Sequence, residues 1–386
     1  MDAGKYPGSS VLVSRRRQEV FFHATGLRDR EGNRPFTRDT VARIYSMTKP
    51  VTSVAVMMLA ERGLFHMDAP VSDFIPEFKD MHALVDGAER LDQTAPCATP
   101  TLHQLLTHTS GLSYGFNGGP LGEAMTKGKY GFQYPGGNLA DMAARLAGLP
   151  LAFAPGTRWE YSEATSVLGR VVEVVSGQTL DAFFADQILG PLGMTDSGFR
   201  VPPHAADRFA ACYSALEGEG LSLDLPTGAP VMKLVDASEG SNYHNATMFS
   251  GGGGMVGTID DYLRFCEMLR LGGALDGARL LSPATCRFMM RNHLAGDIAS
   301  MGPRSFAEQP MNGMGFGLGG AVVLDPGRAR VPGNIGDFSW GGIASTFFWI
   351  DPVLEMTVLF FTQLTPSSAY PSRSELKALI HGALTE

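Results

Sequence analysis

The sequence predicts an α+β fold in which both ends of the chain build one antiparallel sheet, flanked by helices, with a mainly helical lobe inserted between them. Three observations support this fold class. Hairpin-like strands lie near both termini, an apolar helical segment follows the first hairpin, and short helical segments alternate with Pro/Gly loops in the middle. We therefore expect a sheet lobe of residues 1–63 and 246–386 and a mainly helical lobe of residues 64–245.

The composition fits a globular chain of this kind. With 386 residues, 44% hydrophobic and 18% charged, the chain can bury a large core and has room for about two lobes. A net charge of −8 without a basic block argues against nucleic acid as a partner. No apolar run approaches the roughly 18 residues that suggest a membrane span.

Cysteine usage and the start of the chain bear on location and cofactors. The first residues lack the apolar stretch of a signal peptide. The four cysteines have neither paired nor zinc-like spacing, which indicates reduced thiols in a cytoplasmic protein. We expect no metal and no cofactor, and the sequence makes no prediction about the oligomeric state.

The first expected elements are a β-hairpin and a central helix. Apolar residues 11–13 and 19–22 flank the arginines 15–17, which suit a solvated turn better than a binding patch. The segment 48–62 has apolar residues at helical spacing and is apolar nearly all round, so it should be a buried helix. Gly63 is a typical helix stop.

The remainder supplies more helices and a second hairpin. Helical spacing is found at residues 102–106, 139–147, 166–176, 180–188, 260–271, 283–292 and 374–384. Strand-like residues return at 345–350 and 354–361, on either side of an Asp-Pro turn. The chain has no internal repeat.

The candidate nucleophile is Ser46, which begins a Ser-x-x-Lys motif at the mouth of the apolar helix. Residues three apart share a helical face, so the Lys49 amine can lie against the Ser46 hydroxyl. A buried lysine loses its charge readily, and a neutral amine can accept the serine proton. The spacing alone leaves Ser46 evenly balanced between a nucleophile and a helix-capping serine.

Two other serines match catalytic patterns. A second Ser-x-x-Lys, from Ser374 to Lys377, lies on the amphipathic C-terminal segment, and we expect it to be an exposed helix face. Ser113 lies in a Gly-x-Ser-x-Gly pattern, but a nucleophile elbow needs a strand before it and a helix after it. A helix before Ser113 and a loop after it are expected, so this pattern is rejected.

Glycine and histidine patterns suggest no cofactor site. Residues 315–320 match a dinucleotide motif but precede a strand rather than a helix. Residues 251–254 lack the Lys-Ser/Thr of a phosphate loop and suit a tight turn. His103 and His108 are five residues apart and cannot share a helical face as metal ligands, so we expect them on a helix surface.

Five motifs occur in the order found in one enzyme family. They lie at residues 42–50, 105–112, 155–162, 250–255 and 340–342. On these motifs the chain resembles the class C β-lactamase-like serine hydrolases over nearly its whole length. The tyrosine before Ser46 and the Trp-Gly-Gly at 340–342 are most similar to the family VIII carboxylesterases. The resemblance implies the β-lactamase/penicillin-binding-protein fold.

The resemblance also implies roles for individual residues. Ser46 corresponds to the nucleophile, and Lys49 to its proton acceptor or orienting partner. Tyr161 corresponds to the second member of the base pair, since a nearby ammonium can stabilise a phenolate. The backbone N–H groups of Ser46 and Ile343 correspond to the oxyanion hole.

Two departures from the family pattern concern the substrate. Trp340 replaces the strand lysine that binds a carboxylate in lactamases, and Glu163 replaces the asparagine that ends their Tyr-x-Asn motif. Both changes disfavour an anionic substrate and favour a neutral acyl ester. Trp340, Gly341 and Gly342 are then expected to border the substrate. A further departure is that only about seven residues precede the first strand, where the family usually has a helix.

Loop 113–137 is expected to line the pocket because of its aromatic residues, which are Tyr114, Phe116, Phe132 and Tyr134. Of these, Tyr114 is the predicted substrate-binding residue.

The predicted function is therefore a serine hydrolase that cleaves carboxylic esters through a Ser46 acyl-enzyme, with a small-molecule acyl ester as its partner. Three alternatives stay open. One is an acyltransferase that uses the same acyl-enzyme, another is a β-lactamase or D-peptidase-type amidase, and the third is a non-catalytic binding protein on the same fold.

Overall fold

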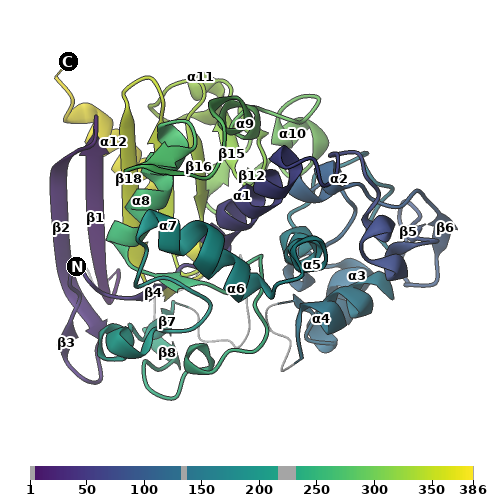
Figure 1. Cartoon of the computed structure of the whole chain (residues 1–386), viewed down its shortest axis with the longest axis horizontal. Coiled ribbons are helices and arrows are strands. Elements are labelled where there is room, and N and C mark those ends of the chain that lie inside the picture. The colour runs from purple at the N-terminus through teal and green to yellow at the C-terminus, as the bar shows by residue number, and fades with distance from the viewer. Residues whose placement is uncertain (1–4, 132–136, 216–231, 386) are drawn as a thin grey trace.

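The computed structural model describes residues 5–131, 137–215 and 232–385 (Figure 1). Its main sheet has eight strands in the order β14-β15-β16-β17-β18-β1-β2-β3, and every neighbouring pair is antiparallel. Strand β1 near the N-terminus pairs directly with β18 near the C-terminus (Figure 1). The predicted α+β fold, with one sheet built from both ends of the chain, is confirmed.

The strands of this sheet include both predicted hairpins. Their bounds are β1 Gly8–Arg15, β2 Gln18–Asp29, β3 Arg34–Pro35, β14 Met314–Phe316, β15 Ala321–Val323, β16 Phe338–Gly341, β17 Phe347–Asp351 and β18 Met356–Thr362. Arg16 and Arg17 form the exposed β1–β2 turn with φ of 52° and 66°. Such left-handed residues match the strand twist in two-residue hairpins.

Helices cover both faces of the sheet, which explains why its central strands are apolar throughout. Tyr262 of α8 (Ile259–Arg270) packs on Phe348 of β17, with ring centroids 5.3 Å apart. The neighbouring residue Trp349 points to the opposite face, because side chains alternate along a strand. It packs there beside Lys377 of α12 (Ser372–Gly382), whose amine lies 5.6 Å from the indole ring.

Helix α1 (Thr48–Glu61) runs through the centre of the molecule (Figure 1). All its residues from Thr48 to Leu59 are buried, as the sequence predicted. Its contacts include α5 (Ala164–Ser176) from the middle of the chain. This helix therefore connects the sheet to the helical part of the molecule.

The middle of the chain is mainly helical and carries short strands. Its elements are β5 His82–Leu84, β6 Thr94–Pro96, α2 Leu102–Leu106, α3 Gly119–Lys127, α4 Leu139–Ala147, α5, α6 Leu180–Phe184, α7 Gly190–Leu192, β7 Cys212–Ser214 and β8 Lys233–Asp236. Strand β7 pairs in parallel with β19 (Leu364–Thr365), so this end of the segment is joined to the C-terminal part of the chain.

Shorter elements complete the described part of the chain. They are β4 Ala42–Arg43, β9 Val256–Gly257, β10 Ala274–Leu275, β11 Ala278–Arg279, β12 Ser305–Phe306, β13 Gln309–Pro310, α9 Pro283–Met289, α10 Ile298–Met301 and α11 Pro326–Ala329. Pairing of β4 with β9 holds the chain just before α1.

Two sequence predictions about local structure are wrong. Within the predicted loop 113–137, residues Gly119–Lys127 form α3, a helix that opens with Gly-Pro, a pair that is more typical of a loop. The helix predicted at 180–188, by contrast, is confirmed, as α6 followed by one π-helical turn. His108 is not on a helix surface: it lies beyond the end of α2, is buried, and its Nδ1 is 3.0 Å from the Ser162 hydroxyl.

The second Ser-x-x-Lys motif also differs from its prediction. Lys377 is buried rather than exposed, and its amine pairs with the carboxylate of Asp337 at 2.8 Å. The partner comes from a loop 40 residues away, so the amphipathic pattern of α12 alone gave no sign of it.

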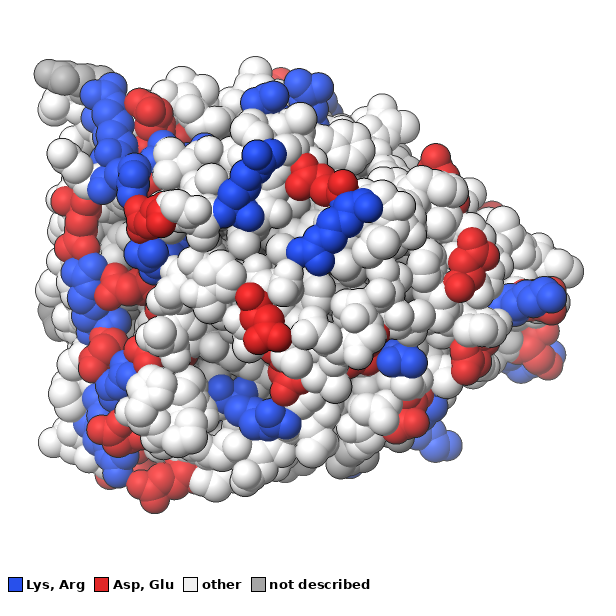
Figure 2. Space-filling model, in the orientation of Figure 1, with Lys and Arg blue, Asp and Glu red and all other residues white. Residues whose placement is uncertain are grey.

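The surface shows no single-sign patch on the face seen in Figure 2, where cationic and anionic side chains are interspersed. The densest mixture of both signs follows the β1–β2 side of the sheet. Across residues 5–131, 137–215 and 232–385, no helix is both long and apolar enough to cross a bilayer.

Candidate active site

Ser46 lies in a one-turn 3₁₀ segment, Tyr45–Met47, that leads directly into α1. Tyr45 has a φ of 42°, a left-handed conformation that is unfavourable for a residue with a side chain. A contact with the chain near β9 stabilises this segment, because the Thr48 hydroxyl accepts a hydrogen bond from the Met255 N–H at 3.1 Å. The strained turn presents the half-buried Ser46 to a pocket.

The Lys49 amine is fully buried and faces oxygen atoms. It donates to the Ser46 Oγ at 3.3 Å, to the Tyr114 hydroxyl at 2.9 Å and to the Gly252 carbonyl at 2.7 Å. Burial lowers the pKa of Lys49 to about 7, although the negative charge of Glu163 opposes this change. A substantial fraction of Lys49 is therefore neutral near pH 7 and able to accept a proton.

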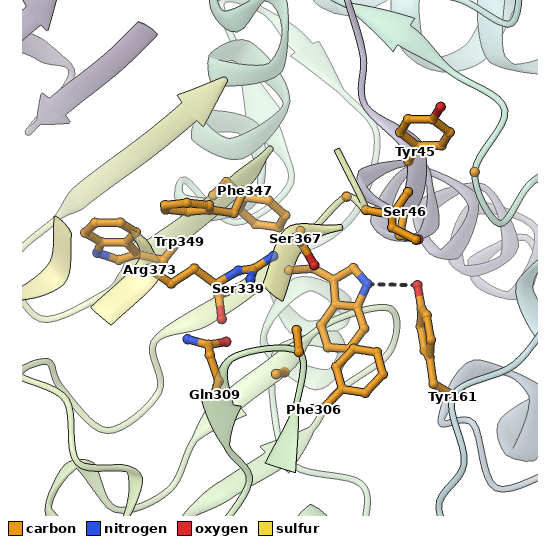
Figure 3. Close-up of a pocket in the computed structure, with 18 of the residues that line it drawn as sticks. Tyr45, Ser46, Tyr161, Phe306, Gln309, Ser339, Phe347, Trp349, Ser367 and Arg373 are labelled. Carbon is orange, nitrogen blue, oxygen red and sulfur yellow. Dashed lines mark hydrogen bonds between the residues drawn. The ribbon is translucent and has the colours of Figure 1, made fainter. Parts of the chain in front are cut away.

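Tyr161 reaches the same point from the loop before α5. Its hydroxyl is directed toward Ser46 and accepts a hydrogen bond from the Trp340 Nε1 at 3.3 Å (Figure 3). The Lys49 Nζ lies 4.4 Å from the centroid of the Tyr161 ring. Burial raises the pKa of Tyr161, and hydrogen bonds from Ser46 and Trp340 oppose this increase. The structure thus brings Ser46, Lys49 and Tyr161 together.

Tyr114 has a role at this site that the sequence did not indicate. The sequence predicts it as a substrate-binding residue, yet its hydroxyl is a direct partner of the Lys49 amine. Burial raises the pKa of Tyr114 well above the usual value, and the negative charge of Glu163 raises it further. Nothing in the sequence spacing could reveal this contact, because the two residues are 65 positions apart.

The end of β16 provides the other side of the site. Gly341, Gly342 and Ile343 line the same pocket as Ser46. Gly342 donates its N–H to the Thr346 carbonyl at 2.7 Å. A Cβ on Gly342 would lie only 2.5 Å from the carbonyl oxygen of Ile44, so glycine is required for the strand to approach the nucleophile segment this closely.

The pocket beyond Ser46 is walled largely by aromatic side chains. Phe306 of the β12–β13 hairpin stacks on Trp340, with centroids 5.8 Å apart and planes inclined by 13°. Phe306 also meets the Tyr161 ring edge-on at 4.9 Å. Tyr114 and Phe116 line this pocket as expected, whereas Phe132 and Tyr134 lie outside the described residues. Such walls suit an apolar acyl or alcohol group.

The competing motifs have structural roles in the folded chain. Ser113 is buried and donates its hydroxyl to Glu160 at 2.5 Å, and no strand precedes it as an elbow requires. Residues 315–320 form the β14–β15 hairpin. The turn at 251–254 supplies the Gly252 carbonyl that accepts a hydrogen bond from the Lys49 amine. Within the described ranges, no cluster of three or more His, Cys, Asp or Glu side chains could hold a metal ion.

The chain is similar to known proteins along almost its full length. The Beta-lactamase family matches residues 1–382. Protein Rv1367c of Mycobacterium tuberculosis is 38% identical over 372 residues, which are 95% of this chain and 88% of that protein. Esterase EstB of Burkholderia gladioli is 35% identical over 362 residues, which are 92% of this chain and 85% of that protein.

A solved structure gives the same grouping. EstCE1, described as a hydrolase with promiscuous acyltransferase activity, has a TM-score of 0.78 and 30% identity, covering 97% of this chain and 93% of that one. The fold and these matches define a serine hydrolase. The chain belongs to the Beta-lactamase family, and the resemblance predicted from the motifs is confirmed.

Proposed function

We propose that this enzyme hydrolyses neutral carboxylic esters through an acyl-enzyme on Ser46. The Ser46 Oγ attacks the ester carbonyl carbon while its proton passes to the Lys49–Tyr161 pair. The backbone N–H groups of Ser46 and Ile343 stabilise the oxyanion of the tetrahedral intermediate. When the intermediate collapses, the ester C–O bond breaks and the leaving alkoxide takes up that proton.

The second half of the reaction uses the same groups. A water molecule gives its proton to the Lys49–Tyr161 pair and attacks the acyl carbon. Collapse of the second intermediate returns a proton to Ser46 and releases the carboxylic acid. In this proposal the sheet lobe, residues 1–63 and 246–386, supplies Ser46 and Lys49. The helical lobe, residues 64–245, supplies Tyr161.

The observation that carries this proposal is the Lys49 amine, buried 3.3 Å from the Ser46 hydroxyl with a pKa lowered to about 7. A protonated lysine could not remove the serine proton, whereas a neutral one can. Tyr161 lines the pocket and its ring centroid lies 4.4 Å from the Lys49 Nζ, so its phenol can relay the proton to the leaving group. Its raised pKa keeps it protonated at rest, so it can act first as a donor.

The ester substrate class is supported by the pocket and by the relatives. Trp340 stands where a lactamase has a carboxylate-binding lysine, and the walls beside it are aromatic. EstB, a relative with 35% identity, is named as an esterase. The four cysteines are free thiols, which supports a reducing, cytoplasmic setting.

Acyl transfer is the second candidate, because EstCE1 is described as having promiscuous acyltransferase activity. It uses the same acyl-enzyme but delivers the acyl group to an alcohol or amine instead of water. The ratio of free acid to transferred product, measured with added acceptor, separates the two. Nitrocefin turnover comparable with ester turnover would favour a β-lactamase, and failure to label Ser46 with a fluorophosphonate would favour a binding protein.

The deciding experiment compares the two serines that begin Ser-x-x-Lys motifs. We expect Ser46→Ala to reduce hydrolysis of p-nitrophenyl butyrate by about 10⁴-fold or more, with unchanged melting temperature and no acyl adduct in intact-protein mass spectrometry. Ser374→Ala is the matched control and should retain wild-type turnover. Turnover retained by folded Ser46→Ala would reject the proposed function.

A further inference from the structure

The pocket contains two cationic side chains although its aromatic walls suit a neutral substrate. Arg373 and Lys377 of α12 both line it, and its lining has no aspartate or glutamate among the described residues. Each cation is neutralised by a buried carboxylate that lies outside the lining. Lys377 pairs with Asp337 at 2.8 Å, and Arg373 pairs with Glu308.

The Arg373–Glu308 pair is close and largely shielded from water. The Arg373 Nη1 lies 2.5 Å from the Glu308 Oε1 and 2.6 Å from the Oε2. Only 13% of the arginine side chain and 6% of the glutamate side chain are exposed. The guanidinium carbon also lies 5.2 Å from the centroid of the Phe347 ring. Water and salt screen the attraction within such a shielded, hydrogen-bonded ion pair much less than within a pair at the surface.

The other guanidinium nitrogen faces the strand that borders the candidate active site. A Cβ on Gly341 would collide with the Arg373 Nη2. In Figure 3 the Arg373 side chain reaches toward the middle of the pocket, between Trp349 and Ser367. Its charge is also close enough to Tyr161 to lower the pKa of that phenol. A substrate group extending along β16 therefore meets Arg373.

Glu308 is supplied by the hairpin that covers the pocket. It lies in the turn between β12 and β13, next to Ala307, which has a φ of 52°. Phe306 on the same hairpin stacks on Trp340. The hairpin thus fixes both an aromatic wall and the carboxylate that occupies Arg373.

We propose that Glu308 is a specificity-determining residue that restricts this pocket to uncharged esters, because its carboxylate neutralises Arg373 by binding the Nη1 with both oxygens. A buried guanidinium is otherwise a strong receptor for a carboxylate. While Glu308 is in place, a substrate carboxylate near Arg373 would meet a second buried anion and be repelled. This inference rests on the proposed ester hydrolysis and names the substrate class.

The test is Glu308→Gln, assayed with p-nitrophenyl half-esters of succinic, glutaric and adipic acids. Each is compared with the same ester whose far carboxyl is methylated, so the two members of a pair differ in charge. We expect the kcat/KM ratio of the anionic to the methylated ester to rise about 10- to 100-fold for at least one chain length, the range of a charged hydrogen bond. A rise in turnover of both members alike would indicate only a loosened hairpin and would overturn the inference.

Two further variants separate charge from structure. Glu308→Gln combined with Arg373→Gln should lose the gain, because no guanidinium is left to bind the carboxylate. Arg373→Gln alone should lower the kcat/KM ratio of the anionic to the methylated ester below that of the wild-type enzyme. This variant tests the inference if Glu308→Gln does not fold. Glu375→Gln, at an exposed glutamate on the same helix, is the matched control and should leave the ratio unchanged.

A binding measurement makes the outcome independent of turnover. The dissociation constants of adipic acid monoamide and of its methyl ester, measured by calorimetry, should show the same change in ratio in Glu308→Gln. An unchanged ratio in both assays would overturn the inference. If the wild-type protein hydrolyses no ester but Glu308→Gln shows the expected change in the binding ratio, only the proposed function is overturned.

Discussion

The two Ser-x-x-Lys motifs of this chain have the same spacing and both place a lysine in the interior, yet their amines meet different partners. Lys49 donates to a serine hydroxyl, a tyrosine hydroxyl and a backbone carbonyl, and no described carboxylate pairs with it. Lys377 pairs with the Asp337 carboxylate at 2.8 Å. The motif is therefore only a spacing, and the environment of the amine determines what it can do.

The difference follows from electrostatics. A buried ammonium without a directly paired carboxylate is unfavourable, so burial lowers the pKa of Lys49 to about 7 against the weaker opposing effect of the Glu163 charge, and the neutral form becomes accessible. The Lys377 amine is instead paired with the buried Asp337 carboxylate, and removing either partner would leave the other buried without a counter-charge. Lys49 is thus suited to proton transfer, while Lys377 contributes to stability.

The largest expected contrast is between Lys49→Met and Lys377→Met. Lys49→Met should reduce kcat/KM by about 10³- to 10⁴-fold, because it removes a proton acceptor, and should cost less stability than Lys377→Met, because relief of an unfavourably buried amine offsets part of the hydrogen bonds that are lost. Lys377→Met should instead lower the free energy of unfolding by about 3 kcal/mol, because it leaves the Asp337 carboxylate buried and unpaired. Ester assays and urea unfolding measure the two effects. A stability loss in Lys49→Met as large as that in Lys377→Met would contradict the comparison.

The second contrast concerns the two phenols around Lys49, whereas no tyrosine in residues 5–131, 137–215 and 232–385 is bonded to the Lys377 amine. Tyr161→Phe should reduce kcat by about 10²- to 10³-fold, since it removes the proposed proton relay. It also leaves the Trp340 indole N–H without its acceptor, at a cost of about 1–3 kcal/mol in stability.

Tyr114→Phe should have a smaller effect, about 10-fold on kcat. Its hydroxyl contacts the Lys49 amine, but the phenol bonded to Trp340, and proposed as the proton relay, is Tyr161. Single-turnover acylation rates distinguish the two variants. Equal losses in both would mean that the two phenols share the relay.

Much of this site could be predicted from sequence because its signals are local. The position of Ser46 and Lys49 on one helix face depends only on helical spacing, and the apolar run of α1 indicates burial. The hairpins at both termini were recognisable from turn residues between apolar runs. The order of the motifs then indicated which tyrosine, among ten in the chain, belongs with them.

The features that escaped prediction all depend on distant contacts. Tyr114 meets Lys49 across 65 residues, Glu308 meets Arg373 across 65, and Asp337 meets Lys377 across 40. Each partner lies in or next to a loop, where neither periodicity nor capping indicates the direction of a side chain. The amphipathic pattern of α12 even favoured exposure for Lys377, since it carries no information about an acidic side chain elsewhere in the fold.

The smallest expected effect is a change in pH dependence that sharpens the description of Lys49. If its neutral form is the acceptor, kcat/KM should be half-maximal near pH 7 and fall tenfold per unit below that pH. The charge of Glu163 raises the pKa of Lys49, so Glu163→Gln should lower this pKa and move the acid limb to lower pH.

The matched control is Glu123→Gln, at an exposed position on α3, which should leave the limb in place. A limb that moves to higher pH in Glu163→Gln, or does not move, would mean that Glu163 does not stabilise the ammonium of Lys49. A limb that persists in Lys49→Met would assign the titration to another group. The direction of the shift is the informative quantity, because desolvation and a nearby anion act on a buried amine with opposite signs.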